Sequence, residues 1–206
     1  MKTIILGLGN TILTDDGAGI YVVREIDTLL KKSNEVSLRA QAKQSRGERG
    51  ILHFVQNDEH GIHGIATAPS GPRNDLPVTS HESRITVVEA SLCGFNFIDL
   101  LAGYDRAVIV DAIHTKDGKP GEFYELDPAA LKPSARLSSL HQIDFATACE
   151  LAKNMGIDFP KEFAIFVMEV EDEFTFGEKP TPKVEAAIPQ MAESIVEILR
   201  NRTWII

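Results

Sequence analysis

The sequence predicts an α/β protein, a three-layer α/β/α sandwich with a mostly parallel, twisted, five-stranded sheet. Two observations support this fold class. Five short segments rich in β-branched and aromatic residues alternate with segments of helical period, which favours strands in one sheet with helices on both faces. The run Val108-Ile109-Val110 is apolar at every position, which is typical of a parallel strand covered on both faces.

The expected strands are bounded by turn residues and are four to eight residues long. In chain order they are Thr3–Leu6, Ile85–Glu89, Ala107–Asp111, Glu122–Leu126 and Phe163–Val170.

Four segments have the spacing of amphipathic helices. The first follows the acidic pair Asp15-Asp16 and places apolar residues on one face at Ile20, Val23, Ile26 and Leu30. The second is the short segment Phe95–Leu101. The third is expected to begin near Ser138 or Ser139 as N-cap and to carry Ile143, Phe145, Ala148 and Leu151.

The fourth helix has the clearest start signal. Thr181 is suited to the N-cap and Pro182 to the first helical position. Its apolar face follows as Ile188, Met191, Ile195 and Leu199. Pro189 lies inside this pattern and is expected to kink or divide the helix.

Composition limits the classes of function. The formal net charge of −9 argues against sequence-independent binding to nucleic acid or to anionic lipid. No apolar run approaches the roughly 20 residues of a membrane span, and the first residues do not resemble a secretory signal, so a cytoplasmic protein is expected. Cys93 and Cys149 lack the spacing of a cysteine metal site or a disulfide framework.

One stretch, residues 37–83, does not fit the alternating pattern. It is polar, rich in Gly, Ser, Asn and Pro, and has no sustained period. A structureless connection of this length is uncommon inside a compact domain. We therefore expect a single domain over residues 1–206 with a flexible insertion at 37–83, which loop-closure entropy tolerates at small cost.

The turn after the first strand contains Gly7-Leu8-Gly9, which suggests a phosphate-binding loop. The dinucleotide fingerprint needs a third glycine where this chain has Ile12, and the acids Asp15 and Asp16 would repel a pyrophosphate. One acid of the pair, Asp15 or Asp16, is expected to cap the first helix, and the other is available for a cation.

A second acid, Glu89, ends the second expected strand. Since ligands bind beyond the carboxyl ends of parallel strands, Asp16 and Glu89 are expected to face one crevice. Two converging carboxylates repel each other unless a cation or a proton neutralises them, so they indicate a divalent metal; two solvated loop acids are the alternative.

A nitrogen ligand would complete such a site. Four histidines lie in the insertion and are expected to be solvated: His53, His60, His63 and His81. His114 follows the third strand and His141 precedes the third helix, and chemistry alone does not choose between these two.

Five sequence blocks together resemble the hydrogenase maturation proteases, endopeptidases that remove a C-terminal extension from the large subunit of nickel–iron hydrogenases. The blocks are GLGNTILTDDGAG, EASLCG, DAIHTKDGKPGEFYEL, SSLHQIDF and FPKEFAIFVMEVEDEF followed by TPKVEAAI. The resemblance extends over essentially the whole chain except for about residues 37–83.

The resemblance implies three metal-binding and catalytic residues, Asp16, Glu89 and His141. It thereby favours His141 over His114. It also leaves Asp15 as the expected cap of the first helix and gives Asp111 a supporting place near the crevice. Where relatives commonly have Asp followed by glycines, this chain has Glu89-Ala90-Ser91, which keeps a carboxylate on a longer arm.

The expected function is then a metal-dependent endopeptidase of aspartic or metallo type that processes the hydrogenase large-subunit precursor after nickel insertion. The metal is expected to be the nickel of the substrate, or another divalent ion such as zinc. The protein is expected to act as a monomer, without nucleic acid or a membrane. A metal-binding chaperone without proteolysis, or a relative disabled by the insertion, is the alternative.

Overall fold

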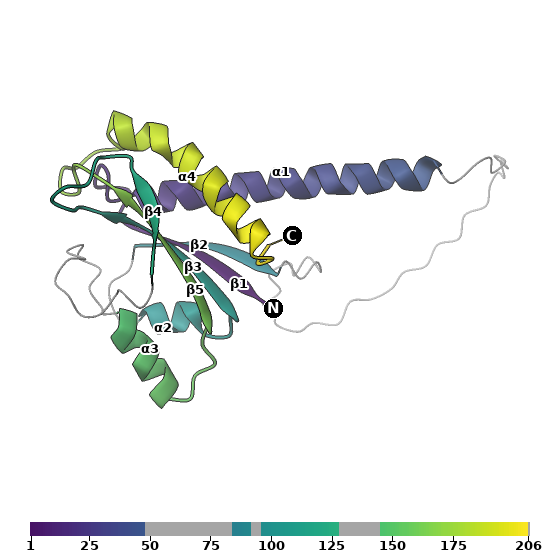
Figure 1. The fold of residues 1–206 in the computed structure, drawn as a ribbon, viewed down its shortest axis with the longest axis horizontal. Coiled ribbons are helices and arrows are strands. Elements are labelled where there is room, and N and C mark those ends of the chain that lie inside the picture. The colour runs from purple at the N-terminus through teal and green to yellow at the C-terminus, as the bar shows by residue number, and fades with distance from the viewer. Residues whose placement is uncertain (48–83, 92–95, 128–144, 206) are drawn as a thin grey trace, which may run out of the picture. The chain divides into compact units, whose positions relative to one another are not determined.

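A computed structural model describes residues 1–47, 84–91, 96–127 and 145–205 (Figure 1). By its internal contacts the chain divides into two units. One comprises Met1–Ser33 with Ser83–Ile206, and the other Asn34–Glu82. The second unit covers nearly the same residues as the predicted insertion, whose flexibility stays a prediction.

The first unit contains a five-stranded sheet in the order β2-β1-β3-β5-β4. The strands are β1 (Thr3–Leu8), β2 (Ile85–Ala90), β3 (Arg106–Ile113), β4 (Phe123–Leu126) and β5 (Glu162–Glu169). All neighbours pair in parallel except β4, which runs antiparallel to β5 at one edge. This arrangement confirms the predicted fold class and all five predicted strands.

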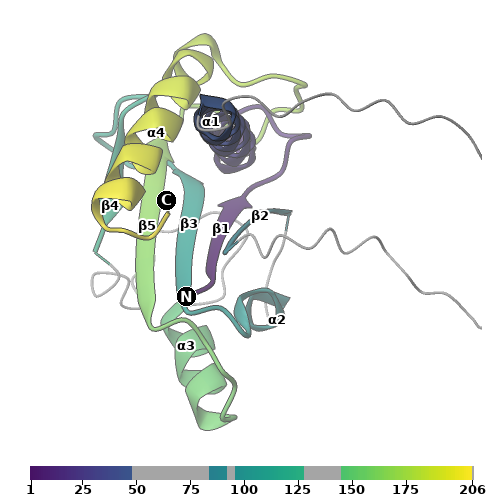
Figure 2. The same cartoon turned by 90° about the vertical axis from the view of Figure 1, so that its right-hand side faces the viewer.

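Among the described residues, four helices accompany the strands: α1 (Ala18–Gly47), α2 (Asn96–Leu101), α3 (Phe145–Asn154) and α4 (Pro182–Asn201). α1 and α4 cover one face of the sheet, and α2 and α3 lie on the other (Figure 2). α1 continues past residue 37, where the insertion was predicted to begin. The predicted start of the third helix, near Ser138 or Ser139, lies outside the described residues.

α4 begins as predicted, with Thr181 at the N-cap and Pro182 as its first residue. Of the two outcomes expected at Pro189, a kink or a division, division of the helix is wrong, because α4 is continuous through this residue, and a kink stays a prediction. Proline removes the N–H that would bond to the carbonyl of Glu185, four residues earlier. Both residues are exposed, so water can satisfy that carbonyl and the helix continues.

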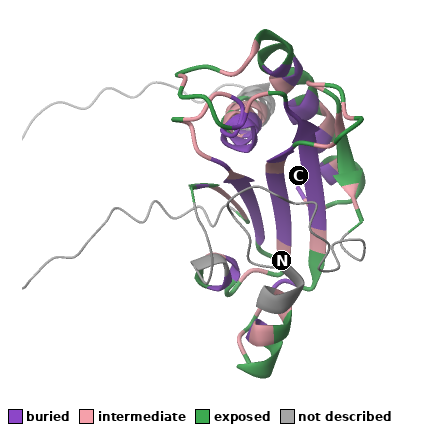
Figure 3. Ribbon diagram, turned by 90° about the vertical axis from the view of Figure 1, so that its left-hand side faces the viewer, coloured by how far each residue is buried: buried purple, intermediate pink, exposed green. Residues whose placement is uncertain are grey.

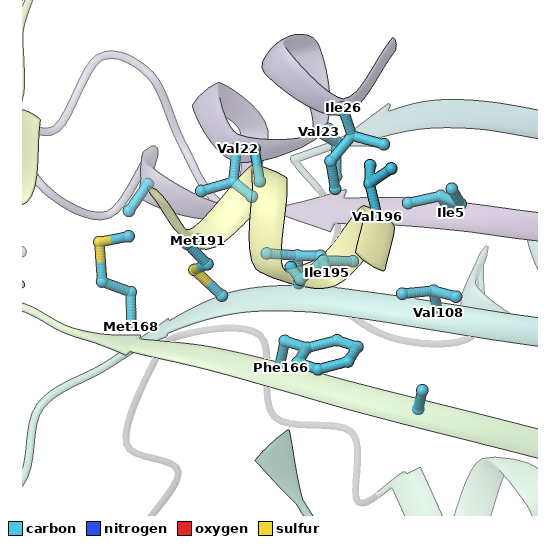
Figure 4. Packing of buried hydrophobic residues seen from close by; sticks show 14 of the residues in the cluster. Ile5, Val22, Val23, Ile26, Val108, Phe166, Met168, Met191, Ile195 and Val196 are labelled. Carbon is cyan, nitrogen blue, oxygen red and sulfur yellow. The ribbon is translucent and has the colours of Figure 1, made fainter. Parts of the chain in front are cut away.

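The larger core lies between the sheet and the pair α1 and α4 (Figure 4). Val22, Val23 and Ile26 of α1 face Met191 and Ile195 of α4, all essentially inaccessible to solvent. The strands differ in burial: β1, β3 and β5 are buried along most of their length, whereas β4 is not (Figure 3).

α1 approaches the sheet closely at Gly19. A Cβ at this position would lie 2.4 Å from the carbonyl oxygens of both Leu8 and Val110, which is too close for any side chain. The glycine therefore lets the first turns of α1 rest on the carboxyl ends of β1 and β3, where the order of the strands reverses. Open α/β sheets bind their ligands at this edge.

Candidate active site

The turn after β1 is built around Gly9. This residue has φ +137°, and a Cβ on it would lie 2.0 Å from the backbone oxygen of Asp16. Asn10 stabilises the turn, because its carbonyl accepts the N–H of Leu13 and its side-chain oxygen accepts the N–H of Ile12. The chain thus folds back on itself, and glycine is needed at residue 9 for this close approach.

Asp15 is fully buried, and its carboxylate joins three segments. It accepts hydrogen bonds from the backbone N–H groups of Glu171 and Asp172, at 3.3 and 3.2 Å, in the loop after β5. It also accepts the N–H of Thr181 at 2.6 Å and the Thr181 hydroxyl at 3.0 Å. Asp15 therefore holds the start of α4, and the expectation that it caps α1 is wrong.

Asp16, the first predicted site residue, is 6% exposed. It lies within the electrostatic field of Glu173, a 9% exposed residue after β5. Burial raises the pKa of Glu173, the negative charge of Asp16 raises it further, and His114 lowers it. The carboxyl ends of β1, β5 and β3 therefore bring Asp16, Glu173 and His114 into one neighbourhood.

Glu89, the second predicted site residue, lies on β2 opposite Gly7 of β1. Its carboxylate is paired with the guanidinium of Arg24 on α1, with Nη2–Oε2 2.7 Å and Nε–Oε1 2.9 Å. The hydrogen bond from Arg24 lowers the pKa of Glu89 below its usual value. Arg24 also lies over the ring of Tyr21, 5.5 Å from its centroid.

His141, the third predicted site residue, lies outside the described residues. Within residues 1–47, 84–91, 96–127 and 145–205, no three His, Cys, Asp or Glu side chains are grouped so that they could hold a metal ion. Asp111, the predicted supporting acid, is half-buried at the end of β3 and accepts the N–H of Ala112 at 2.8 Å.

The segment that follows His114 is fixed by a buried carboxylate. Glu169 is 2% exposed and accepts the N–H and the hydroxyl of Thr115, at 3.0 and 2.8 Å, and the hydroxyl of Tyr124 at 2.8 Å. Gly118 lies directly over this carboxylate, since a Cβ there would be 2.0 Å from Oε2. Burial, followed by the bond to Glu169, raises the pKa of Tyr124 to about 12.

Sequence reasoning missed three residues at this edge: Glu173, the Arg24 partner of Glu89, and Asp15 as a link to α4. The acidic run Glu171-Asp172-Glu173 directly after the fifth strand is a signal for the first, because it occupies the same edge as Asp16. Neither of the other two has a signal in the sequence, since their partners lie 65 or more positions away.

The fold is that of hydrogenase maturation endopeptidases. HybD from E. coli, a hydrogenase maturating endopeptidase, matches with a TM-score of 0.61 and 22% identity, over 98% of this chain and 94% of that one. The [NiFe] hydrogenase maturation protease HycI from Thermococcus kodakarensis KOD1 matches at 0.55 and 19%, over 97% and 92%. HybD from Thermococcus kodakarensis matches at 0.54 and 18%, over 96% and 99%. No curated protein sequence matches the chain.

The sequence itself matches the family of hydrogenase maturation proteases. The match spans residues 75–198, which is more than half of the 206 residues. The chain therefore belongs to the hydrogenase maturation protease family, which confirms the resemblance seen in its motifs. Glu89 and His141 fall within the matched stretch, and Asp16 precedes it.

In the part of the chain that the structure describes, no helix is long and apolar enough to cross a membrane.

Proposed function

We propose that this protein is the endopeptidase that removes the C-terminal extension of a nickel–iron hydrogenase large-subunit precursor after nickel insertion. Membership of the family supports the protease activity. The placement of Asp16 supports the site: a nearly buried carboxylate at the carboxyl edge of the sheet, next to an Asp15 anchored by four hydrogen bonds. Burying an ionisable group is costly, so a nearly buried carboxylate at the ligand-binding edge of the sheet is a candidate functional residue.

Asp16, Glu89 and His141 are the residues that we propose to hold a divalent ion. Two carboxylates and an imidazole form a donor set suited to nickel or zinc, and they leave positions open for the substrate. In this proposal the nickel belongs to the precursor and is part of the substrate. A divalent ion held there would polarise the scissile carbonyl and lower the pKa of a bound water.

The protein's own residues prepare this site in two ways. Asp15 fixes the turn that carries Asp16, so that little ordering remains when the substrate binds. Arg24 pairs with the carboxylate of Glu89 at the surface and lowers its pKa, which favours the ionised form. A metal that binds Glu89 must displace this guanidinium. Glu173 lies near Asp16 and His114, and its pKa is raised chiefly by burial, which makes it a candidate to hold or donate a proton at this edge.

We further propose that the enzyme acts as a monomer in the cytoplasm, on a protein partner and without nucleic acid. The net charge of −9 favours a protein partner over a polyanion.

The test is the intact mass of a nickel-loaded large-subunit precursor after incubation with the wild-type protein or with Asp16→Asn, Glu89→Gln or His141→Ala. Asp27→Asn is the matched control, because Asp27 is an α1 carboxylate paired with Lys31 away from the sheet edge. We expect loss of a C-terminal peptide with the wild type and the control, and at least about a hundredfold slower loss with the three variants.

Equal cleavage by Asp16→Asn would keep the protease and remove Asp16 from its essential residues. No cleavage by any protein, with divalent metal still bound, would favour the non-proteolytic chaperone.

A further inference from the structure

Three large apolar side chains are exposed next to the candidate active site. Ile12 is 62% exposed, Phe174 69% and Phe176 80%. Ile12 belongs to the turn after β1, and the two phenylalanines belong to the loop after β5. We call these three residues the apolar rim.

The apolar rim stands on an ordered backbone. Leu13 and Phe176 form an antiparallel bridge, flanked by the hydrogen bonds Thr14 N–H to Thr175 O, 2.9 Å, and Gly177 N–H to Ile12 O, 3.0 Å. Because Leu13 is paired with Phe176, the adjacent Ile12 projects from the opposite face of this bridge. The side chain of Asp172 accepts the N–H groups of Phe174 and Thr175, at 3.2 and 2.9 Å. The two loops therefore form a short ribbon, and its already ordered backbone loses little conformational entropy when a partner binds.

The apolar rim borders the site in the chain as well as in space. Ile12 precedes Asp16 by four residues. Phe174 follows Glu173, whose pKa is raised in part by the charge of Asp16. Asp15 joins the same two loops through the N–H groups of Glu171 and Asp172. A polypeptide lying across the rim would thus be led to Asp16.

The charge around the apolar rim restricts its partner. Residues 171–179 contain four acids, Glu171, Asp172, Glu173 and Glu178, and one cation, Lys179. Lys183 lies 3.5 Å from Glu171 and offsets one of these charges. A partner with apolar side chains between basic ones is complementary to this surface, whereas an acidic or purely polar segment is not.

We propose that the apolar rim binds the precursor polypeptide beside its cleavage site, through an apolar segment flanked by Lys or Arg. This inference rests on the proposed function, since it assigns the docking surface of that substrate. Phe174 and Phe176 are the anchors, because large aromatic side chains contribute most of the binding energy at protein interfaces.

The experiment measures kcat and KM for cleavage of the nickel-loaded precursor, and its equilibrium binding to the same proteins. The variants are Ile12→Ser and the double variant Phe174→Ser/Phe176→Ser. The control is Met155→Ser, which removes a 64% exposed apolar side chain just beyond the C-terminal end of α3. Thermal unfolding of each variant verifies its fold.

We expect the double variant to raise KM and Kd about tenfold or more, with kcat nearly unchanged, and Met155→Ser to change neither. Raising the salt concentration from about 50 to about 500 mM should weaken binding, because it screens the acids around the rim.

Cleavage with unchanged KM in the double variant would overturn the docking surface and leave the protease intact. Binding by the wild type without cleavage, lost in the double variant, would support the surface and reject the proposed function. Neither binding nor cleavage by the wild type would reject both.

Discussion

At the scale of single residues, the neighbouring acids Asp15 and Asp16 have different tasks. The carboxylate of Asp15 accepts four hydrogen bonds within the fold, three of them from backbone N–H groups. Asp16 lies at the sheet edge beside Glu173 and His114. In the proposed function, Asp15 therefore has a structural role and the neighbouring Asp16 a catalytic one.

Asp15→Asn should destabilise the protein by about 3 kcal/mol, because an amide cannot accept all four hydrogen bonds and places its own N–H groups against donors. Asp16→Asn should leave the free energy of unfolding within about 1 kcal/mol of the wild type while abolishing cleavage. Urea unfolding measures the stability of both variants, and the precursor mass assay measures cleavage. A larger loss of stability for Asp16→Asn than for Asp15→Asn would reverse this assignment.

Arg24 is the residue that competes with any ligand of Glu89. Arg24→Met should change stability by less than about 1 kcal/mol, because both partners of the ion pair are about half exposed. Without the guanidinium the pKa of Glu89 should rise towards its usual value, since the hydrogen bond from Arg24 is the largest cause of its lowering.

If Glu89 is a ligand, Arg24→Met should also bind zinc or nickel more tightly than the wild type in a calorimetric titration. Lys31→Met is the control, since it removes another α1 cation that pairs with Asp27. Unchanged metal affinity in Arg24→Met would remove Glu89 from the ligand set.

At the scale of elements, the bond between Tyr124 and Glu169 joins the antiparallel edge strand β4 to the end of β5 and to the turn after β3. The pKa of Tyr124 is raised to about 12, so the folded protein holds this proton more tightly than the unfolded chain, where tyrosine ionises near 10. This stabilisation is therefore complete below about pH 10 and is lost as the pH rises to about 12.

Tyr124→Phe should destabilise the protein by about 1 kcal/mol at neutral pH, because the buried Glu169 loses a donor, and the 38% exposure of Tyr124 lets solvent weaken this bond. The difference from the wild type should shrink between about pH 10 and 12. Phenolate absorbance in an alkaline titration gives the pKa, with Tyr104→Phe as the control. A wild-type phenol at position 124 that ionises near 10 would contradict the role of this bond.

At the scale of the whole molecule, the residues of the described hydrophobic clusters lie in the unit formed by Met1–Ser33 and Ser83–Ile206. The described core of the sheet and its covering helices is therefore made by residues of this unit, and none of these core residues lies in residues 34–82. Loop-closure entropy depends only weakly on the length of a connection, so its length has little effect on stability.

Replacing residues 34–82 by a Gly/Ser linker of about ten residues should leave a protein that unfolds cooperatively and retains any cleavage activity. Circular dichroism during thermal unfolding and the precursor mass assay check the two statements. A protein that no longer folds would show that the second unit contributes to the core. A folded protein without activity would place part of the substrate site in residues 34–82.

From local sequence patterns one can predict the layers of the fold, the five strands, the start of α4 at Pro182 and the family. These follow from local signals: periodicity, caps, an apolar run at Val108–Val110 and short motifs, all read over a few neighbouring residues. The continuation of α1 past residue 37 was missed, because those residues have no sustained apolar period.

The hydrogen-bond and ion-pair partners of the polar side chains, in contrast, are visible only in the tertiary structure. Asp15 bonds to residues 156 to 166 positions away, Glu89 to Arg24 65 positions away, and the apolar rim forms from loops more than 160 positions apart. Such contacts depend on the order of the strands and on the close approach at Gly19, which no local pattern records. The fold is therefore encoded locally, whereas the surroundings of Asp16 are created when distant strand ends meet at one edge of the sheet.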